Sequence, residues 1–469
     1  RTQIREQPER RIRQRGRRAT ATSKQGGTPW WYSDPSIVGS MIAKLVLMAL
    51  WISIGTSFLT QTFRQRRHQP DHRYLECVAG GDAGVAEPVK TRRIRYSGKN
   101  PRTFKEKYKE QRGDEEVVEK VKIKGGTPAG QHRPIMLSEC MQFMGLEEQD
   151  SEGAGVPIKS ILGQSALNVV DCTLGYGGHS MEIMRRIHKQ GGSLYALDQD
   201  ASELEKTKVR LQECALALGG SDEATPQLAT CFHENFGDLQ ALARTQGILG
   251  QVHAVLADLG YSSMQVDDPL RGFTYKYDGP LDLRMDQRSN VTAVSFLSSM
   301  KSVGALADVL QKNSDEIHAY PIAKAILKPS GSEYNVPLTT TAFADRVREA
   351  LKAELAKSHS PLPEKKDQDK CVARCLQAVR IEVNKEFDVL ERLLSDLPDI
   401  LAPGGRAVFL TFHSGEDRRV KKALKGGFKD GTYSAWGRDV VLASHTERNS
   451  NPRSKCAKLR WAVRACAES

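Results

Sequence analysis

The chain lacks the paired cysteines from which structural zinc sites and disulfide frameworks are built. Its nine cysteines are scattered through 469 residues, and no Cys-x-x-Cys occurs. Cys371 and Cys375 have no second pair of metal ligands close to them in the sequence. This pattern predicts reduced thiols in a reducing compartment and no bound metal. There is also no internal repeat, which argues against a solenoid or propeller.

Acidic residues are scarce near the N-terminus, and the whole chain carries a net charge of +12. Basic residues are dense at 10–18 and again at 92–124. Such runs occur more often in solvated tails or targeting segments than in recognition surfaces. The charge therefore suggests a polyanionic partner such as nucleic acid without establishing one.

Residues 37–59 form a long apolar run with a single charge, Lys44, and a basic segment (RQRR) follows at 64–67. A run of this length can span a bilayer, or it can be the apolar part of a cleaved leader. We expect residues 1–125 to be a basic, poorly ordered extension with a leader or a membrane anchor at 37–59. The sequence is compatible with both a leader and an anchor.

A glycine-rich segment, residues 171–180 (DCTLGYGGHS), lies between an apolar run at 166–170 and a helical pattern at 181–187. The order predicts a strand, a turn and a helix, and glycines let the backbone approach a ligand at the helix start. Asp198 ends the next apolar run, twenty residues after Gly178. A carboxylate there can hold both hydroxyls of a ribose, so we predict an adenosine-containing cofactor.

The glycine turn favours one such cofactor. It reads G-x-G-G, followed by His179, and has Ser180 where the dinucleotide fingerprint needs a third, spaced glycine. That fingerprint serves to place a pyrophosphate on the helix start. S-adenosylmethionine has no phosphate and suits the turn better, although a nicotinamide oxidoreductase has the same sheet and acidic residue and remains an alternative.

A third apolar run, residues 252–257, ends in Asp258. Ligands of doubly wound sheets lie outside the carboxyl ends of the strands. Because Asp171, Asp198 and Asp258 all follow predicted strands, we expect them to line one pocket. Asp258 is the first choice for a polar group at the reacting centre, and a helix or turn cap is the alternative for each.

Strands and helices alternate from about residue 166 to 260, which predicts a parallel sheet covered on both faces. A later strand is expected at 406–412, and the gap of about 145 residues before it is too long for one crossover. Apolar residues recur at helical spacing over 343–355 and 379–397. We therefore predict an inserted helical lobe, residues 286–375, within a sheet domain made of 126–285 and 376–469.

Two dipeptides common in enzymes that methylate bases are absent. There is no Pro-Pro, which many amino-methylating enzymes use beside the acceptor amine, and no Pro-Cys, which often carries the nucleophile for methylation at ring carbon. The residues up to this point indicate a methyltransferase-like pocket and leave the acceptor atom open.

Ten ordered blocks resemble the RsmH (MraW) family of ribosomal small-subunit RNA cytosine-N4 methyltransferases, including its organellar relatives. The resemblance covers roughly residues 130–465. The blocks are 132–139 (HRPIMLSE), 171–180, 233–236 (HENF), 258–267 (DLGYSSMQVD), 271–273 (RGF), 278–285 (DGPLDLRM), 377–384 (QAVRIEVN), 403–405 (PGG), 412–418 (FHSGEDR) and 451–454 (NPRS).

The resemblance implies a class I S-adenosylmethionine-dependent methyltransferase fold, Rossmann-like, with an inserted helical substrate lobe. The substrate would be the N4 amine of a cytidine in the decoding region of small-subunit rRNA. An organellar member would work in a mitochondrion or plastid. A catalytically silent ribosome-assembly factor that keeps the RNA-binding lobe is the alternative. The implied cofactor contacts are Gly177, Gly178, His179, Asp198, Phe236, Asp258 and Gln265.

Five further residues are candidates for substrate contacts, each with a structural alternative. Arg271 can meet a phosphate or pair with Asp267, Asp278 or Asp282, and Phe273, like Tyr261 and Tyr275, can stack on a base or pack in a core. Arg380 and Asn384 lie one helical turn apart and can face RNA or water. His413 ends a strand at the ligand edge. The family pattern is broken at Leu376, at Gly415 and at 313–316 (NSDE).

Overall fold

A computed structural model of the chain describes residues 134–153, 156–164, 166–219, 228–330, 333–359, 361 and 363–466. The expected basic extension at 1–125, with its apolar run at 37–59, lies outside these residues. Among the helices within them, none combines the length and the apolar character that crossing a membrane requires.

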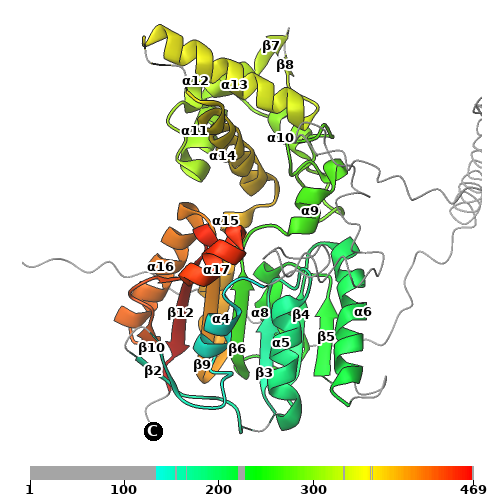
Figure 1. Cartoon of the computed structure of the whole chain (residues 1–469), viewed down its shortest axis with the longest axis vertical. Coiled ribbons are helices and arrows are strands. Elements are labelled where there is room, and N and C mark those ends of the chain that lie inside the picture. Colours follow the sequence, from blue (N-terminus) through cyan, green and yellow to red (C-terminus); the bar gives the residue numbers. More distant parts are fainter. Residues whose placement is uncertain are drawn as a thin grey trace, which may run out of the picture. The chain divides into compact units, whose positions relative to one another are not determined.

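An eight-stranded sheet organises the part of the chain that follows residue 166 (Figure 1). The strand order is β10-β12-β9-β6-β3-β4-β5, with β11 paired to β12. The strands β5, β4, β3, β6 and β9 are parallel, whereas β12 is antiparallel to β9, β10 and β11. The chain moves outward from β3 through β4 and β5 and then returns to β6 on the other side of β3. This reversal creates a topological switch point at the carboxyl end of β3.

The bounds of these strands follow the apolar runs of the sequence. They are β3 (Asn168–Asp171), β4 (Ser193–Leu197), β5 (Ala229–Phe232), β6 (Val252–Asp258), β9 (Leu401–Thr411), β10 (Tyr433–Trp436), β11 (Val441–Leu442) and β12 (Lys458–Arg464). Two small hairpins lie outside the sheet, β1 (Ser151–Gly153) with β2 (Val156–Ile158), and β7 (Lys328–Ser330) with β8 (Glu333–Asn335).

Helices cover both faces of the sheet, as the sequence predicts (Figure 1). Neighbouring strand residues point to opposite faces, so Val169 packs in the core cluster of one face and Val170 in that of the other. The first face is covered by α4 (Leu137–Phe143), α5 (Gly178–Ile187) and α6 (Ala201–Ala217), and the second by α8 (Leu239–Thr245), α15 (Glu386–Ile400) and α16 (Ser414–Lys429). Two short helices, α9 (Ser263–Asp267) and α17 (His445–Ser450), lie in loops.

The predicted helices between β6 and β9 form a lobe with a hydrophobic core of its own (Figure 1). Its buried residues run from Leu281 to Val383. The expected boundary between residues 375 and 376 falls inside one helix of this lobe, α14, whose buried residues on both sides of that point share the same core. The helices are α10 (Ala293–Ser298), α11 (Val303–Ser314), α12 (Ala319–Ile326), α13 (Thr340–Lys357) and α14 (Lys365–Val383).

The apolar stripe over 379–397 is two helices rather than one. The break falls at Asn384 and Lys385, and Lys385 has a φ of 52° in the left-handed region. Val379 and Val383 pack in the lobe, whereas Leu390 and the later apolar residues of the stripe pack against the sheet. The helical spacing continues across the break, so the sequence pattern does not reveal it.

Trp461 on β12 provides a test of the sheet core. It is fully buried, and its ring stacks on Phe143 of α4 with centroids 5.2 Å apart. We expect Trp461→Ala to reduce the free energy of unfolding by about 3–5 kcal/mol, because it removes a large buried ring and leaves a cavity. Urea unfolding followed by circular dichroism measures the loss. Trp436→Ala, at a half-buried position on β10, is the control and should cost clearly less; equal losses would contradict this account.

Candidate active site

A cavity of about 600 Å³ opens at the carboxyl ends of β3, β4 and β6. This volume lies within the range of small-molecule sites. The wall of the cavity is formed by the glycine turn, the ends of the strands and the start of α16. Gln377 and Arg380 of the helical lobe also line it. The cavity therefore lies between the sheet domain and the lobe, at the switch point of the sheet.

The predicted glycine turn forms one side of the cavity. Gly177 is the N-cap of α5 and has a φ of 85°, and a Cβ atom there would lie only 2.7 Å from Cγ2 of Thr207. A Cβ at Gly178 would lie 3.0 Å from Cγ of Pro134. Both glycines thus allow close packing within the protein while their backbone faces the cavity.

Asp198 follows β4 and lines the cavity. Its Oδ2 accepts a hydrogen bond from the Gly175 N–H at 2.7 Å, and its Oδ1 accepts one from the Asp200 N–H at 2.8 Å. Burial raises the pKa of Asp198 to about 6, although the two backbone hydrogen bonds oppose that rise. A carboxylate oxygen can accept more than one hydrogen bond, so both oxygens can still bind ligand hydroxyls.

Asp258 ends β6 and lines the same cavity. Its Oδ2 lies 3.7 Å from Nδ1 of His179, whose other ring nitrogen, Nε2, lies 3.0 Å from the carbonyl oxygen of Ile135. A carbonyl only accepts, so Nε2 carries a proton, and Nδ1 is the ring nitrogen that faces Asp258. Burial raises the pKa of Asp258 to about 6, His179 lowers it, and Asp171 and Glu416 raise it. A carboxyl with this pKa can exchange a proton near neutral pH.

The third predicted carboxylate, Asp171, is not in the cavity wall, and this corrects the expectation of a pocket with three acids. It is buried, accepts the Ser180 Oγ–H at 2.6 Å and accepts the Thr173 N–H at 3.0 Å. Asp171 therefore ties the end of β3 to the first turn of α5. Of the alternatives, a turn cap describes it, because its Oδ1 bonds the N–H two residues further along, whereas the N-cap of α5 is Gly177.

Asp200 is the residue that the sequence analysis missed. This buried N-cap of α6 accepts hydrogen bonds from the Ser202 N–H at 3.1 Å, Gln265 Nε2 at 3.0 Å and Arg271 Nη1 at 2.7 Å. Gln265 also lines the cavity, as does Phe236 in the loop after β5. An Asp two residues after a strand-end Asp, just before a helical pattern, is a cap signal that could have identified Asp200.

Arg271 does not reach the cavity. Besides Asp200 it bonds the carbonyl oxygens of Arg284 and Met285, at 3.1 and 3.0 Å, so its guanidinium is used within the protein. Its carboxylate partner is therefore Asp200 and not Asp267, Asp278 or Asp282, the three that the sequence suggests. The sequence could not reveal this pair because 71 residues separate Arg271 from Asp200.

Asn384 is also bonded inside the protein rather than to solvent. Its Nδ2 donates to the Leu283 carbonyl at 2.8 Å, and its Oδ1 accepts the Met285 N–H at 2.8 Å. The amide therefore fastens the segment at 283–285 to the end of α14. It does not belong to the wall of the main cavity.

Arg380 and His413, in contrast, line the cavity. Arg380 is buried, forms two hydrogen bonds with Glu386 at 2.8 and 2.9 Å, and lies 4.4 Å above the ring of Tyr261. His413 Nε2 lies 3.0 Å from Glu416 Oε1. Burial alone would raise the pKa of Glu416, but His413 and the Phe412 N–H lower it below its usual value.

An aromatic pair stands at the cavity. Tyr261 lines it and is about half exposed, and the ring of Phe273 packs against Tyr261 with centroids 5.7 Å apart. Phe273 itself is half-buried against the core of the helical lobe and does not line the cavity. Of the two rings, Tyr261 is therefore the one that a base could contact.

The departures from the family pattern lie in the helical lobe and at the start of α16. A Cβ at Gly415 would lie 2.6 Å from Cζ of Phe387, so this ring occupies the space that a larger residue would need. Leu376 is buried in the lobe, and Asn313 Nδ2 donates to the Ala378 carbonyl at 3.3 Å. None of the three positions touches the glycine turn.

The raised pKa of Asp258 predicts a pH-dependent stability. Between about pH 4 and pH 6 the carboxyl ionises in the unfolded chain but stays protonated in the folded one. The folded state then holds more protons, so the wild type should lose stability relative to Asp258→Asn as the pH rises through this window. The change is at most about 3 kcal/mol, and smaller because the cavity admits solvent. Urea unfolding of both proteins from pH 4 to 7 measures it; a difference that is constant with pH would contradict it.

The comparisons with known proteins agree with this geometry. Residues 129–465 match the MraW methylase family. The "Ribosomal RNA small subunit methyltransferase H 1" of Lachnoclostridium phytofermentans is 40% identical over 386 residues, which are 81% of this chain and 94% of that protein. The "Ribosomal RNA small subunit methyltransferase H 2" of Alkaliphilus metalliredigens is 40% identical over 382 residues, 81% of this chain and 99% of that protein.

A solved S-adenosylmethionine-dependent O-methyltransferase from Thermotoga maritima has a TM-score of only 0.26 at 7% identity, covering 65% of this chain and 62% of that one. The sheet order and the family match confirm the predicted class I methyltransferase fold. With its switch-point cavity between sheet and lobe, and with a match that spans most of its length, this chain belongs to the MraW methylase family.

Proposed function

We propose that this protein transfers the methyl group of S-adenosylmethionine to the N4 amine of a cytidine in the decoding region of small-subunit rRNA. One observation carries the proposal: the glycine turn, Asp198 and Asp258 converge on a single cavity that the helical lobe also lines. The names of the relatives, ribosomal RNA small subunit methyltransferases, support rRNA as the substrate.

The residues of the cavity suit the cofactor. Asp198 keeps accepting capacity for the two ribose hydroxyls, and the backbone of Gly177 and Gly178 allows close approach. His179, Phe236 and Gln265 complete the wall that the adenine and methionine parts would contact. When bound, S-adenosylmethionine supplies an electrophilic methyl group on a sulfonium.

Asp258 is our candidate for the catalytic residue. The amine nitrogen forms a bond to the methyl carbon while the carbon–sulfur bond breaks and its electron pair stays on sulfur. The methylated nitrogen must then lose a proton, and Asp258, with a pKa of about 6, is placed to accept it. His179, beside Asp258, helps to stabilise the ionised carboxylate before the transfer.

We assign the substrate residues two kinds of role. Arg380 and His413 contact the substrate from the cavity wall, and Tyr261, supported by Phe273, stacks on the target base. Arg271 and Asn384 act indirectly, because they hold the segment at 283–285 that closes one side of the site.

We further propose that residues 1–125 direct the protein to a mitochondrion or plastid, where ribosomes of bacterial type offer the substrate. The basic composition and the apolar run at 37–59 support a leader, and a membrane anchor is the other outcome. Imaging of the tagged full chain, with N-terminal sequencing of the mature product, distinguishes the two.

The activity is tested with the full chain, labelled S-adenosylmethionine and small ribosomal subunits that lack the modification. Mass spectrometry of the rRNA nucleosides should detect N4-methylcytidine. Asp258→Asn should reduce the rate by about 10²- to 10⁴-fold, the usual contribution of a proton acceptor, while cofactor binding persists.

Failure to find N4-methylcytidine at any stage of subunit assembly would contradict the proposal. Normal subunit binding without any methylation would favour the silent assembly factor. Calorimetry in which only a nicotinamide cofactor binds would favour the oxidoreductase.

Asp198 is tested by cofactor affinity. Asp198→Asn replaces a charged acceptor of ribose hydroxyls with a neutral amide, and we expect binding to weaken about 10- to 100-fold, or ~1.5–3 kcal/mol. Calorimetry with S-adenosylmethionine measures the change. Asp439→Asn, which removes an exposed carboxylate on another part of the chain, should bind normally. Equal affinities of the two variants would rule out the ribose role.

A further inference from the structure

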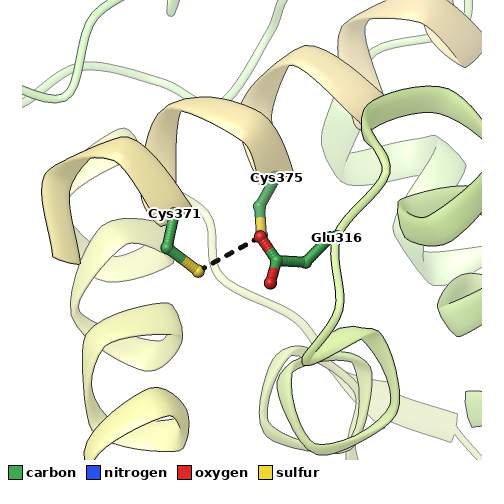
Figure 2. A group of neighbouring side chains, drawn as sticks. All are labelled: Glu316, Cys371 and Cys375. Atoms are coloured by element: carbon green, nitrogen blue, oxygen red, sulfur yellow. Dashed lines mark hydrogen bonds between the residues drawn. The ribbon is translucent and has the colours of Figure 1, made fainter. Parts of the chain in front are cut away.

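Three side chains of metal-ligating type meet inside the helical lobe, outside the wall of the cavity (Figure 2). They are Glu316, Cys371 and Cys375, and one potential ligand atom from each lies within 4.8 Å of the others. All three residues are buried. The two cysteines lie one turn apart on α14, so they face the same side, and Glu316 comes from the segment between α11 and α12.

The carboxylate of Glu316 is already oriented toward the thiols. Its Oε1 accepts the His318 N–H at 3.0 Å, while its Oε2 lies 2.7 Å from Nη2 of Arg374 and 3.4 Å from Sγ of Cys371. The side chain of Glu316 has no exposed surface. Carboxylate ligands of metals are usually held in this way by hydrogen bonds from groups behind them.

The charges of the cluster balance around a divalent cation. Two thiolates and a carboxylate carry three negative charges. A bound divalent ion compensates two of these charges, and the guanidinium of Arg374 compensates the third. A buried ionic site needs this compensation, because an uncompensated charge inside a protein is costly. Sulfur ligands with one carboxylate select a thiophilic ion such as zinc over calcium or magnesium.

We propose that Glu316, Cys371 and Cys375 form a binding site for a thiophilic divalent cation, with zinc as the preferred ion. Three protein ligands leave one position of a tetrahedral zinc ion for a water molecule. The ion links the segment after α11 to α14. The sequence predicts no metal because Glu316 stands 55 residues before Cys371, outside any local pattern of ligands.

The position of the site gives it a structural consequence. Asp315, the neighbour of Glu316, accepts the Ser414 Oγ–H at 2.8 Å and pairs with Arg418 at 3.2 Å, both on α16. The first turn of α16 contributes Glu416 to the wall of the cavity. A cation on Glu316 therefore stabilises the segment through which the lobe contacts the sheet domain.

The test uses the full chain, purified with a reductant and stripped of metal by a chelator. Titration with Co²⁺ should produce a thiolate-to-cobalt charge-transfer band that saturates at a single ion per chain, and Zn²⁺ should abolish the band by displacing cobalt. Zinc should also raise the melting temperature, because it binds the folded state. Cys371→Ser and Cys375→Ser should lose both the band and the zinc-dependent rise.

Cys214→Ser is the matched control, because it removes a buried thiol from another helix, α6, and should keep both responses. A wild type without the band, or a band that persists in both cluster variants, overturns the proposal. Cysteines that only fill space as small apolar groups would give that result. If a cysteine variant fails to fold, the proposal is judged instead from the cobalt and zinc responses of the wild type and of Glu316→Gln. All measurements are made without methyl donor or rRNA, so they do not depend on the proposed function.

Discussion

The parallel pairing of β4, β3 and β6 is the constraint on which the site depends. Parallel strands place their carboxyl ends at one edge, and the register sets Asp171 beside Ala196 and Leu256. The residues that follow β4 and end β6, Asp198 and Asp258, must then approach the same space. The turn after β3 lies at this edge too, and its Gly175 N–H donates a hydrogen bond to Asp198.

Several carboxylates lie at this edge of the sheet, and they differ in the groups to which they are bonded. Asp171 is bonded to a hydroxyl and a backbone N–H, and Asp200 is paired with Arg271. Both can therefore be buried as parts of the framework. Among the residues that the structure describes, neither Asp198 nor Asp258 forms an ion pair with an arginine or lysine, and burial raises the pKa of each to about 6. Groups left with perturbed pKa values at a cavity are those that chemistry can use.

The helical lobe depends on contacts that no local pattern reveals. Arg271 reaches Asp200 across 71 residues, Asn384 reaches Leu283 across 101, and Asp315 reaches Arg418 across 103. Of these pairs, the one between Asp315 and Arg418 connects the lobe directly to a helix of the sheet domain, α16. Two of the side chains involved, Arg271 and Asn384, could be picked out from the sequence, but their partners could not. The sequence suggests a substrate role for both, because a polar residue in a specific motif gives no sign of which group it bonds.

The amino-acid sequence by itself determined the alternation of strands and helices, the glycine turn, the strand-end positions of Asp198 and Asp258, and the family blocks. These features depend on spacing along a few neighbouring residues, where the periods of strands and helices are expressed directly. Only the tertiary structure decided that Asp171 lies outside the cavity, that the stripe at 379–397 is split between two cores, and that Glu316 meets Cys371 and Cys375. Each of these depends on how distant segments pack, and packing is a property of the assembled chain.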